Sequence, residues 1–287
     1  MDIDKEVNFL KILVTGANGC IGEGVVDALS NLNVDIITTD VDNVSINEHV
    51  KYIQANLFDI DNPYVFFNKP DVLLHLAWRN GFIHNADSHL IELPKHYEFI
   101  KKMACGGIKR FCGMGSVHEV GFFEGAVSEK TPTNPLSLYG IAKNTLRQST
   151  ELLMVEKNIE FQWIRGFYIV GNQMRGNSIF SKITESFKNK IKEFPFTNGN
   201  NQFDFIDYKD FCKQVSAVVT QNKINGIINC CSGYPQLIKD RVEQFIKDNG
   251  YDIKLKYGAF PNRPYDSKAI WGDDTKIKKI MNLYDQK

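Results

Sequence analysis

Two residue types that can exchange protons stand four positions apart in the segment Tyr139-Gly140-Ile141-Ala142-Lys143. Positions i and i+4 share one face of a helix, so a helix here would place the Tyr139 phenol beside the Lys143 ammonium group. A neighbouring positive charge favours the phenolate and lowers the pKa of a tyrosine toward the range used in proton transfer. Ser116 ends an upstream strand-like run, where its hydroxyl can bond the same reacting oxygen. These residue types predict acid–base chemistry at a substrate oxygen.

A glycine-rich loop near the amino terminus predicts a binding site for a phosphate-containing ligand. The loop, Thr15-Gly16-Ala17-Asn18-Gly19-Cys20-Ile21-Gly22, follows a β-rich run and precedes a helical pattern. Its glycines suit a tight turn, a close approach of the backbone to a pyrophosphate and close helix–strand packing. The amino terminus of the following helix favours an anion. A glycine-rich turn without a ligand is the alternative for this motif taken alone.

Asp40 stands at the end of the next predicted strand and narrows the choice of ligand. A carboxylate at this place accepts hydrogen bonds from both ribose hydroxyls of adenosine, and it would repel a 2′-phosphate. We therefore expect NAD(H) to be preferred, while NADP(H) stays open because a lysine from another loop could offset the charge. One chain contains Asp40, the glycine loop, and the trio Ser116, Tyr139 and Lys143. Chance explains such a combination poorly.

The elements that must position these residues alternate between strand and helix in the first half of the chain. Strands are predicted at 9–15, 34–39, 51–54, 71–76, 108–114 and 161–170, and helices at 21–32, 87–105 and 137–156. Pro94 lies in the second of these helices and predicts either a kink or the helix's true first turn. Beyond Gly171, helices are predicted at 178–192, 208–220 and 236–248, and strands at 202–206, 226–230 and 254–257.

This alternation predicts an α/β fold, a Rossmann-type doubly wound parallel sheet. We expect residues 1–171 to form the NAD-binding domain with the Ser–Tyr–Lys site, and residues 172–287 to form a smaller α/β region that mainly binds substrate.

Composition excludes several other classes of protein. Thirty-four basic and thirty-four acidic residues balance, which argues against a broad surface for nucleic acid or anionic membranes. No apolar run approaches the ~18 residues of a membrane span, and Met1 to Glu6 does not resemble a signal peptide. The six cysteines form no CxxC pair and predict reduced thiols in the cytoplasm. The histidines at 75, 84, 89 and 96 do not have metal-ligand spacing, so we expect no metal.

Several segments together resemble one family, the extended short-chain dehydrogenase/reductases, also described as NAD-dependent epimerases/dehydratases. Its members act mainly on nucleotide-activated sugars. The segments that match family motifs are Thr15–Gly22, His75-Leu76-Ala77-Trp78, Ser116 with Tyr139 and Lys143, Ile164–Gly171, Asp204–Asp210 and Arg263-Pro264-Tyr265-Asp266. Asn56 departs conservatively from the aspartate that the family usually has before Leu57.

The resemblance implies a role for each matching residue. The implied catalytic residues are Ser116, Tyr139 and Lys143. The implied cofactor-binding residues are Gly16, Asn18, Gly19, Cys20, Ile21, Gly22, Asp40, Asn56, Leu57, Leu76, Ala77, Trp78, Tyr139, Lys143 and Phe167. Substrate contacts are expected from His118, Tyr168, Asn177 and Arg263. The family also implies a homodimer built from helices 87–105 and 137–156.

The residues after Ser116 bear on the reaction. Dehydratases of this family carry Asp-Glu directly after the catalytic hydroxyl, whereas this chain has Val117 and His118, so dehydration is not expected. The chain is most similar in look to reductases of 4-keto-6-deoxy nucleotide sugars, of the kind that make dTDP-fucose for surface polysaccharides. In that interpretation NADH reduces a C4 ketone, Tyr139 donates the proton, and Lys143 holds the nicotinamide ribose. A nucleotide-sugar 4-epimerase, which uses the same residues, is the alternative, and a non-catalytic NAD-binding regulatory subunit is a remote one.

Overall fold

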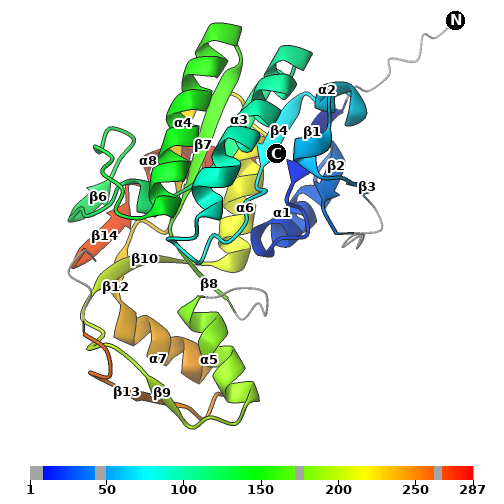
Figure 1. Cartoon of the computed structure of the whole chain (residues 1–287). Coiled ribbons are helices and arrows are strands. Elements are labelled where there is room, and N and C mark those ends of the chain that lie inside the picture. Colours follow the sequence, from blue (N-terminus) through cyan, green and yellow to red (C-terminus); the bar gives the residue numbers. More distant parts are fainter. Residues whose placement is uncertain (1–8, 43–49, 172–177, 262–266, 287) are drawn as a thin grey trace, which may run out of the picture.

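The computed structural model describes residues 9–42, 50–171, 178–261 and 267–286 (Figure 1). No helix in these ranges is both long and apolar enough to cross a bilayer.

A seven-stranded parallel sheet forms the centre of the larger part of the molecule. Its order is β11-β7-β5-β4-β1-β2-β3, with every neighbouring pair parallel. The strands are β1 (Leu10–Thr15), β2 (Val34–Asp40), β3 (Lys51–Gln54), β4 (Val72–His75), β5 (Arg110–Ser116), β7 (Glu160–Gly166) and β11 (Gly226–Cys230). The predicted parallel α/β sheet is confirmed, and the strand order changes direction between β1 and β4, where doubly wound sheets bind their ligands.

Helices cover both faces of this sheet, because alternate residues of each strand point to opposite sides. Ile12 and Val14 of β1 belong to one core with residues of α1 (Cys20–Ser30) and α6 (Tyr208–Val219). Leu13 belongs to a second core with α3 (Ser88–Gly106) and α4 (Leu138–Lys157). The remaining elements of this part are α2 (Pro63–Phe66), α8 (Thr275–Tyr284) and the 3-10 turns η1 (Leu57–Asp59) and η2 (Val117–Glu119).

A smaller part lies beyond the carboxyl ends of the large sheet's strands (Figure 1). Strands β12 (Pro235–Leu237), β10 (Gln202–Asp207), β14 (Ala269–Gly272) and β6 (Gly125–Val127) form a mixed sheet, and β8 (Tyr168–Val170) pairs with β10. Helices α5 (Ile179–Lys188) and α7 (Ile238–Asp248) and the pair β9 (Glu193–Pro195) and β13 (Lys254–Lys256) complete it. Neither part is confined to one side of Gly171 in the sequence. The larger part includes β11, α6 and α8, which follow Gly171, and the smaller part includes β6 and β8, which precede it.

Three local predictions need correction. The single strand predicted over 161–170 is two strands, β7 and β8, that part at Phe167 and pair in different sheets. Pro94 lies well inside α3 and does not mark its first turn. The helix predicted to Lys192 ends at Lys188, and Lys190 adopts a left-handed conformation with φ 59° before β9 begins. The sequence patterns also missed the short elements α2, β6, β9, β12, β14 and η2, and the terminal helix α8.

Candidate active site

The glycine loop has the close backbone packing that its sequence predicts. Gly16 has φ +70°, and a Cβ there would lie 2.6 Å from the backbone nitrogen of Ala77. A Cβ on Gly22 would lie 2.2 Å from the Gly16 carbonyl oxygen. Helix α1 begins at Cys20, directly after the loop, so its unpaired N–H groups face the place where an anion would sit. This cradle fits the pyrophosphate of a dinucleotide.

Asp40 lies at the end of β2 beside the loop, as predicted. Its Oδ2 accepts the backbone N–H of Asn18 at 2.9 Å, and its Oδ1 accepts that of Val41 at 2.8 Å. Each carboxylate oxygen can still accept a second hydrogen bond, so the residue fits a ribose diol. Asn56 caps η1 by accepting the N–H of Phe58, and Leu57 is buried in the second core.

One cavity of about 700 Å³ joins the glycine loop to the residues predicted to be catalytic. Of the residues predicted from the sequence, its walls include Gly16, Gly19, Cys20, Ile21, Gly22, Leu76, Trp78, Ser116, His118, Tyr139, Lys143, Phe167 and Tyr168. Asn18, Asp40, Asn56, Leu57 and Ala77 are not among the described residues that line it. The predicted substrate residues Asn177 and Arg263 lie outside the described residues.

Helix α4 holds Tyr139 in its first turn and Lys143 one turn later. Ser137 caps the helix by accepting the N–H of Gly140 at 3.1 Å. The N–H of Tyr139 donates to the carbonyl of His84 at 2.8 Å, so a loop after β4 is attached to the start of the helix. This capping satisfies N–H groups that a helix otherwise leaves unpaired.

The Tyr139 hydroxyl is held by Ser116 in a strongly buried site. The ring of His84 stacks against the Tyr139 ring with centroids 5.6 Å apart. Burial raises the pKa of Tyr139 above its usual value, the charge of Glu119 raises it further, and a hydrogen bond with Ser116 lowers it. The predicted lowering of this pKa is therefore wrong, because the loss of solvent outweighs the hydrogen bond with Ser116.

Lys143 is only 2% exposed, and this burial affects its charge. Its Nζ donates to the Met114 carbonyl at 2.8 Å and lies 4.0 Å from the centroid of the Trp78 ring. Burial lowers the pKa of Lys143 to about 7, while the charge of Glu119 opposes that shift. The ammonium group is therefore only partly protonated near neutral pH before cofactor binds.

The histidines near the site are bound to neighbours in the protein. Thr15 Oγ1 lies 2.9 Å from His75 Nδ1, and His75 Nε2 lies 2.9 Å from His96 Nδ1. Burial lowers the pKa of both histidines, that of His96 to about 3, so both stay neutral. Trp78 Nε1 donates to His89 at 3.1 Å, which fixes the indole against Lys143. The described residues contain no group of three or more side chains arranged to hold a metal ion.

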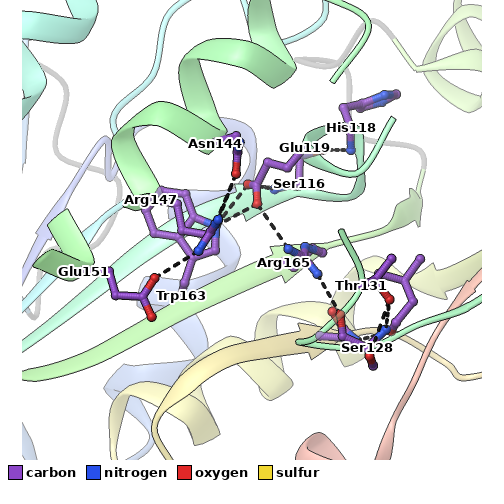
Figure 2. Close-up of polar contacts among 12 residues, drawn as sticks. Ser116, His118, Glu119, Ser128, Thr131, Asn144, Arg147, Glu151, Trp163 and Arg165 are labelled. Carbon is purple, nitrogen blue, oxygen red and sulfur yellow. Dashed lines mark hydrogen bonds and ion pairs between the residues drawn. The ribbon is translucent and has the colours of Figure 1, made fainter. Parts of the chain in front are cut away.

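Glu119 contacts the backbone of Ser116 and was not among the site residues predicted from the sequence (Figure 2). Ser116 Oγ accepts the N–H of His118 at 3.3 Å, and Glu119 Oε1 accepts the N–H of Ser116 at 2.7 Å. This is a capping box, whose S-x-x-E pattern is visible in the sequence. Because Ser116 Oγ accepts from His118, its own hydroxyl proton is available to the Tyr139 oxygen. Glu119 is not among the described residues that line the cavity.

Comparison with known proteins identifies the family. The model of the NAD dependent epimerase/dehydratase family matches residues 12–231. The chain belongs to this family. It is an NAD-dependent enzyme of the extended short-chain dehydrogenase/reductase class.

Individual relatives differ in what they act on. The chain is 39% identical over 269 residues to dTDP-6-deoxy-L-talose 4-dehydrogenase (NAD(+)) of Aggregatibacter actinomycetemcomitans, covering 92% of this chain and 99% of that one. The UDP-N-acetylglucosamine 4-epimerase of Methanobrevibacter ruminantium superposes with a TM-score of 0.81 at 21% identity, covering 95% and 92% of the two chains. The UDP-glucuronic acid 4-epimerase of Bacillus cereus, solved with UDP-glucuronic acid and NAD, superposes with a TM-score of 0.79 at 20% identity, covering 95% and 93%. These two similarities concern the fold.

Proposed function

We propose that the protein is an oxidoreductase that interconverts the C4 ketone and C4 alcohol of a 6-deoxy sugar carried on a nucleoside diphosphate, with dTDP as the first candidate. The observation that carries this proposal is the relative named dTDP-6-deoxy-L-talose 4-dehydrogenase, which matches nearly end to end. Oxidation of a C4 alcohol and reduction of the C4 ketone are the two directions of one reaction. The predicted reductase is therefore the same chemistry in the reverse direction.

The cavity supports this reaction through the groups that it offers. Its described lining residues include no carboxylate and no guanidinium group, and Tyr139 lies on its wall together with Ser116 and Lys143. Phe82, Ile83 and Phe180 give the same cavity an apolar portion, which suits the methyl group of a 6-deoxy sugar better than a hydroxymethyl or carboxylate group.

The residues divide the work of the reaction between them. Bound NADH supplies the hydride to C4, and bound NAD accepts it in the opposite direction. In reduction the Tyr139 hydroxyl donates its proton to the C4 oxygen, and in oxidation the Tyr139 oxygen takes that proton back. With substrate bound, the Ser116 hydroxyl donates to the reacting oxygen beside Tyr139. Lys143 binds the nicotinamide ribose and, when protonated, favours the phenolate that remains after the transfer.

A 4-epimerase is the second candidate, because epimerases share this fold and the same residues can oxidise and re-reduce C4. The two are separated by supplying NADH with 4-keto-6-deoxy sugars on dTDP, GDP and UDP and following the nicotinamide absorbance. Stoichiometric NADH oxidation with one sugar, abolished by Tyr139→Phe, supports the reductase. Interconversion of nucleotide hexoses with NAD retained supports the epimerase. No turnover despite NAD binding supports a non-catalytic subunit.

The same proposal includes a homodimer formed through α3 and α4, which pack side by side. Ile141, Leu152 and Val155 lie along one face of α4, and the last two are 74% and 75% exposed. Ile91 of α3 is 63% exposed. Light scattering should give the mass of two chains for the wild type and one for Leu152→Glu/Val155→Glu, and a monomeric wild type would contradict the dimer.

All six cysteines are free thiols, as expected in a reducing compartment, and we propose a cytoplasmic location. Cell fractionation tests it.

A further inference from the structure

Three buried side chains hold the turn that carries Ser116 in place (Figure 2). Glu119 is fully buried, and its Oε1 accepts the N–H of Ser116. Trp163 of β7 donates its Nε1–H to both carboxylate oxygens, at 3.0 and 3.1 Å. Arg165 of the same strand places Nη2 3.6 Å from Oε2, and its side chain is also fully buried. The Glu119 carboxylate therefore accepts its hydrogen bonds from the protein and lies beside a buried guanidinium group.

This arrangement requires glycine at the position that precedes Ser116 in β5. Gly115 precedes Ser116, and a Cβ there would lie 2.1 Å from Trp163 Nε1 and 2.3 Å from Glu119 Oε1. Gly113 similarly leaves room for the Trp163 ring, at 2.4 Å. The two glycines of β5 therefore make the space in which the indole and the carboxylate meet beneath the catalytic serine.

The carboxylate can act on the reacting groups in two ways without touching a ligand. Its bond to the Ser116 backbone determines where Oγ points, and its charge acts across the α4–η2 contact on Tyr139 and Lys143. Two cations lie near this contact, Arg165 on β7 and Arg147 on α4. Arg147 is already bonded to Asn144 and Glu151, as Figure 2 shows.

We propose that Glu119 is a positioning residue of this site, which directs the Ser116 hydroxyl toward Tyr139 and supplies the buried negative charge that balances Lys143 and an oxidised nicotinamide. The proposal rests on the oxidoreductase function proposed above.

The electrostatics agree with the geometry. The charge of Glu119 raises the pKa of Tyr139 and opposes the lowering of the pKa of Lys143 by burial. The titratable groups that face these two residues from other elements are His75 on β4, His96 and His89 on α3, His84 in the loop after β4, and His118 on η2. Burial keeps the pKa of His75 and that of His96 low, so neither supplies charge near neutral pH.

The charge is tested by Glu119→Gln, with affinities for NAD and NADH measured by calorimetry. The nicotinamide carries a positive charge only when oxidised, so loss of the carboxylate should weaken NAD binding by about threefold or more while NADH binding changes less. This measurement needs no turnover, so it stands even if the wild type reduces none of the keto sugars and the proposed reaction fails.

Turnover gives a second readout of the same variant. Without the carboxylate, the pKa values of Tyr139 and Lys143 both fall, so the alkaline limb of the pH profile of kcat should move to lower pH by about one unit. A role in folding alone would lower kcat without moving this limb.

The positioning role is tested separately by Glu119→Asp, which keeps the charge on a shorter side chain that reaches the Ser116 N–H poorly. We expect kcat to fall about tenfold, with the ratio of NAD to NADH affinity unchanged. On a Ser116→Ala background the same change should cost less than about threefold, because the hydroxyl that it positions is already gone. This cycle also tests the proposal if Glu119→Gln fails to fold.

Asp204→Asn is the matched control, because Asp204 is a fully buried carboxylate that accepts hydrogen bonds from Ser232, Gly233 and Gly272 in the smaller sheet. It should lower thermal stability without changing the affinity ratio or the pH limb. The proposal is overturned if Glu119→Gln leaves the ratio of NAD to NADH affinity and the alkaline limb of the pH profile at wild-type values. It is also overturned if Asp204→Asn shifts them equally, or if Glu119→Asp and Ser116→Ala are additive.

Discussion

Gly115→Ala should be among the most damaging single-methyl changes in this protein, although glycine is normally a poor strand residue. The new Cβ would lie 2.1 Å from Trp163 Nε1, whereas real Cβ contacts essentially never fall below 3.0 Å, so the neighbours must move by at least about 0.9 Å. Trp163 and Glu119 are both fully buried and cannot swing into solvent. The methyl group therefore breaks the contact between them.

Three contributions set the size of the stability loss: two destabilise the folded protein and one stabilises it. Overpacking a close-packed core costs about 1–3 kcal/mol. Separating a buried carboxylate from its donors adds about 1–3 kcal/mol. Restricting the unfolded chain by replacing glycine with alanine returns about 0.4–1 kcal/mol. We expect the free energy of unfolding to fall by about 2–4 kcal/mol, which lowers Tm by roughly 4–8 °C in a chain of this length.

Urea unfolding followed by tryptophan fluorescence measures this loss, and Gly166→Ala is the control for stability. Gly166 pairs with Ser116 on the neighbouring strand, and a Cβ there would meet Phe211 at 3.3 Å, a contact that small shifts relieve. The control should lose less than about 1 kcal/mol. Gly115→Ala should also lower kcat of the folded fraction, because Ser116 moves with its neighbours. A variant within about 0.5 kcal/mol of wild type, with unchanged kcat, would refute the buried contact on which this argument depends.

Three further changes test the site itself. Tyr139→Phe should lower kcat at least about 100-fold while NADH affinity stays within about threefold, because only the proton donor is lost; wild-type turnover would remove Tyr139 from the mechanism. Asp40→Ala should weaken NAD binding about tenfold and reduce discrimination against NADP, measured by titration of both; unchanged discrimination would contradict the ribose contact. Burial lowers the pKa of Lys143 to about 7 in the folded chain, so the unfolded chain binds more protons above that pH and the stability contributed by Lys143 rises with pH. Relative to Lys143→Met, the wild type without cofactor should therefore gain up to roughly 3 kcal/mol between pH 7 and 9.5 in urea unfolding, and a flat difference would show that Lys143 stays charged.

Local patterns were enough to predict the parallel sheet and the residues that meet in the cavity. The glycine loop, Asp40 and the Tyr139–Lys143 spacing each depend on a few consecutive residues or on one strand or helix. The carboxyl ends of parallel strands lie at one edge of the sheet, so residues at those ends are brought together whatever the rest of the chain does. Ser116 lies at such an end, that of β5, and it contacts Tyr139 in the first turn of α4.

Other features depended on pairing between distant segments. The break at Phe167 could not be read from the strand-like run 161–170, because each half of the run pairs with a different sheet. The short strands β6 and β14 stabilise each other across more than a hundred residues of sequence, and neither carries a strand signal of its own.

The sequence by itself determined which candidate groups lie near the site, and the tertiary structure decided their charge and orientation. The spacing of Tyr139 and Lys143 predicted a lowered phenol pKa, yet burial reverses that direction and also lowers the pKa of Lys143. Glu119 could be recognised in the sequence as a capping residue, but not as a buried anion beneath Ser116. Burial depends on every segment that excludes water from a group, and such an environment exists only once β5, β7 and α4 have packed together.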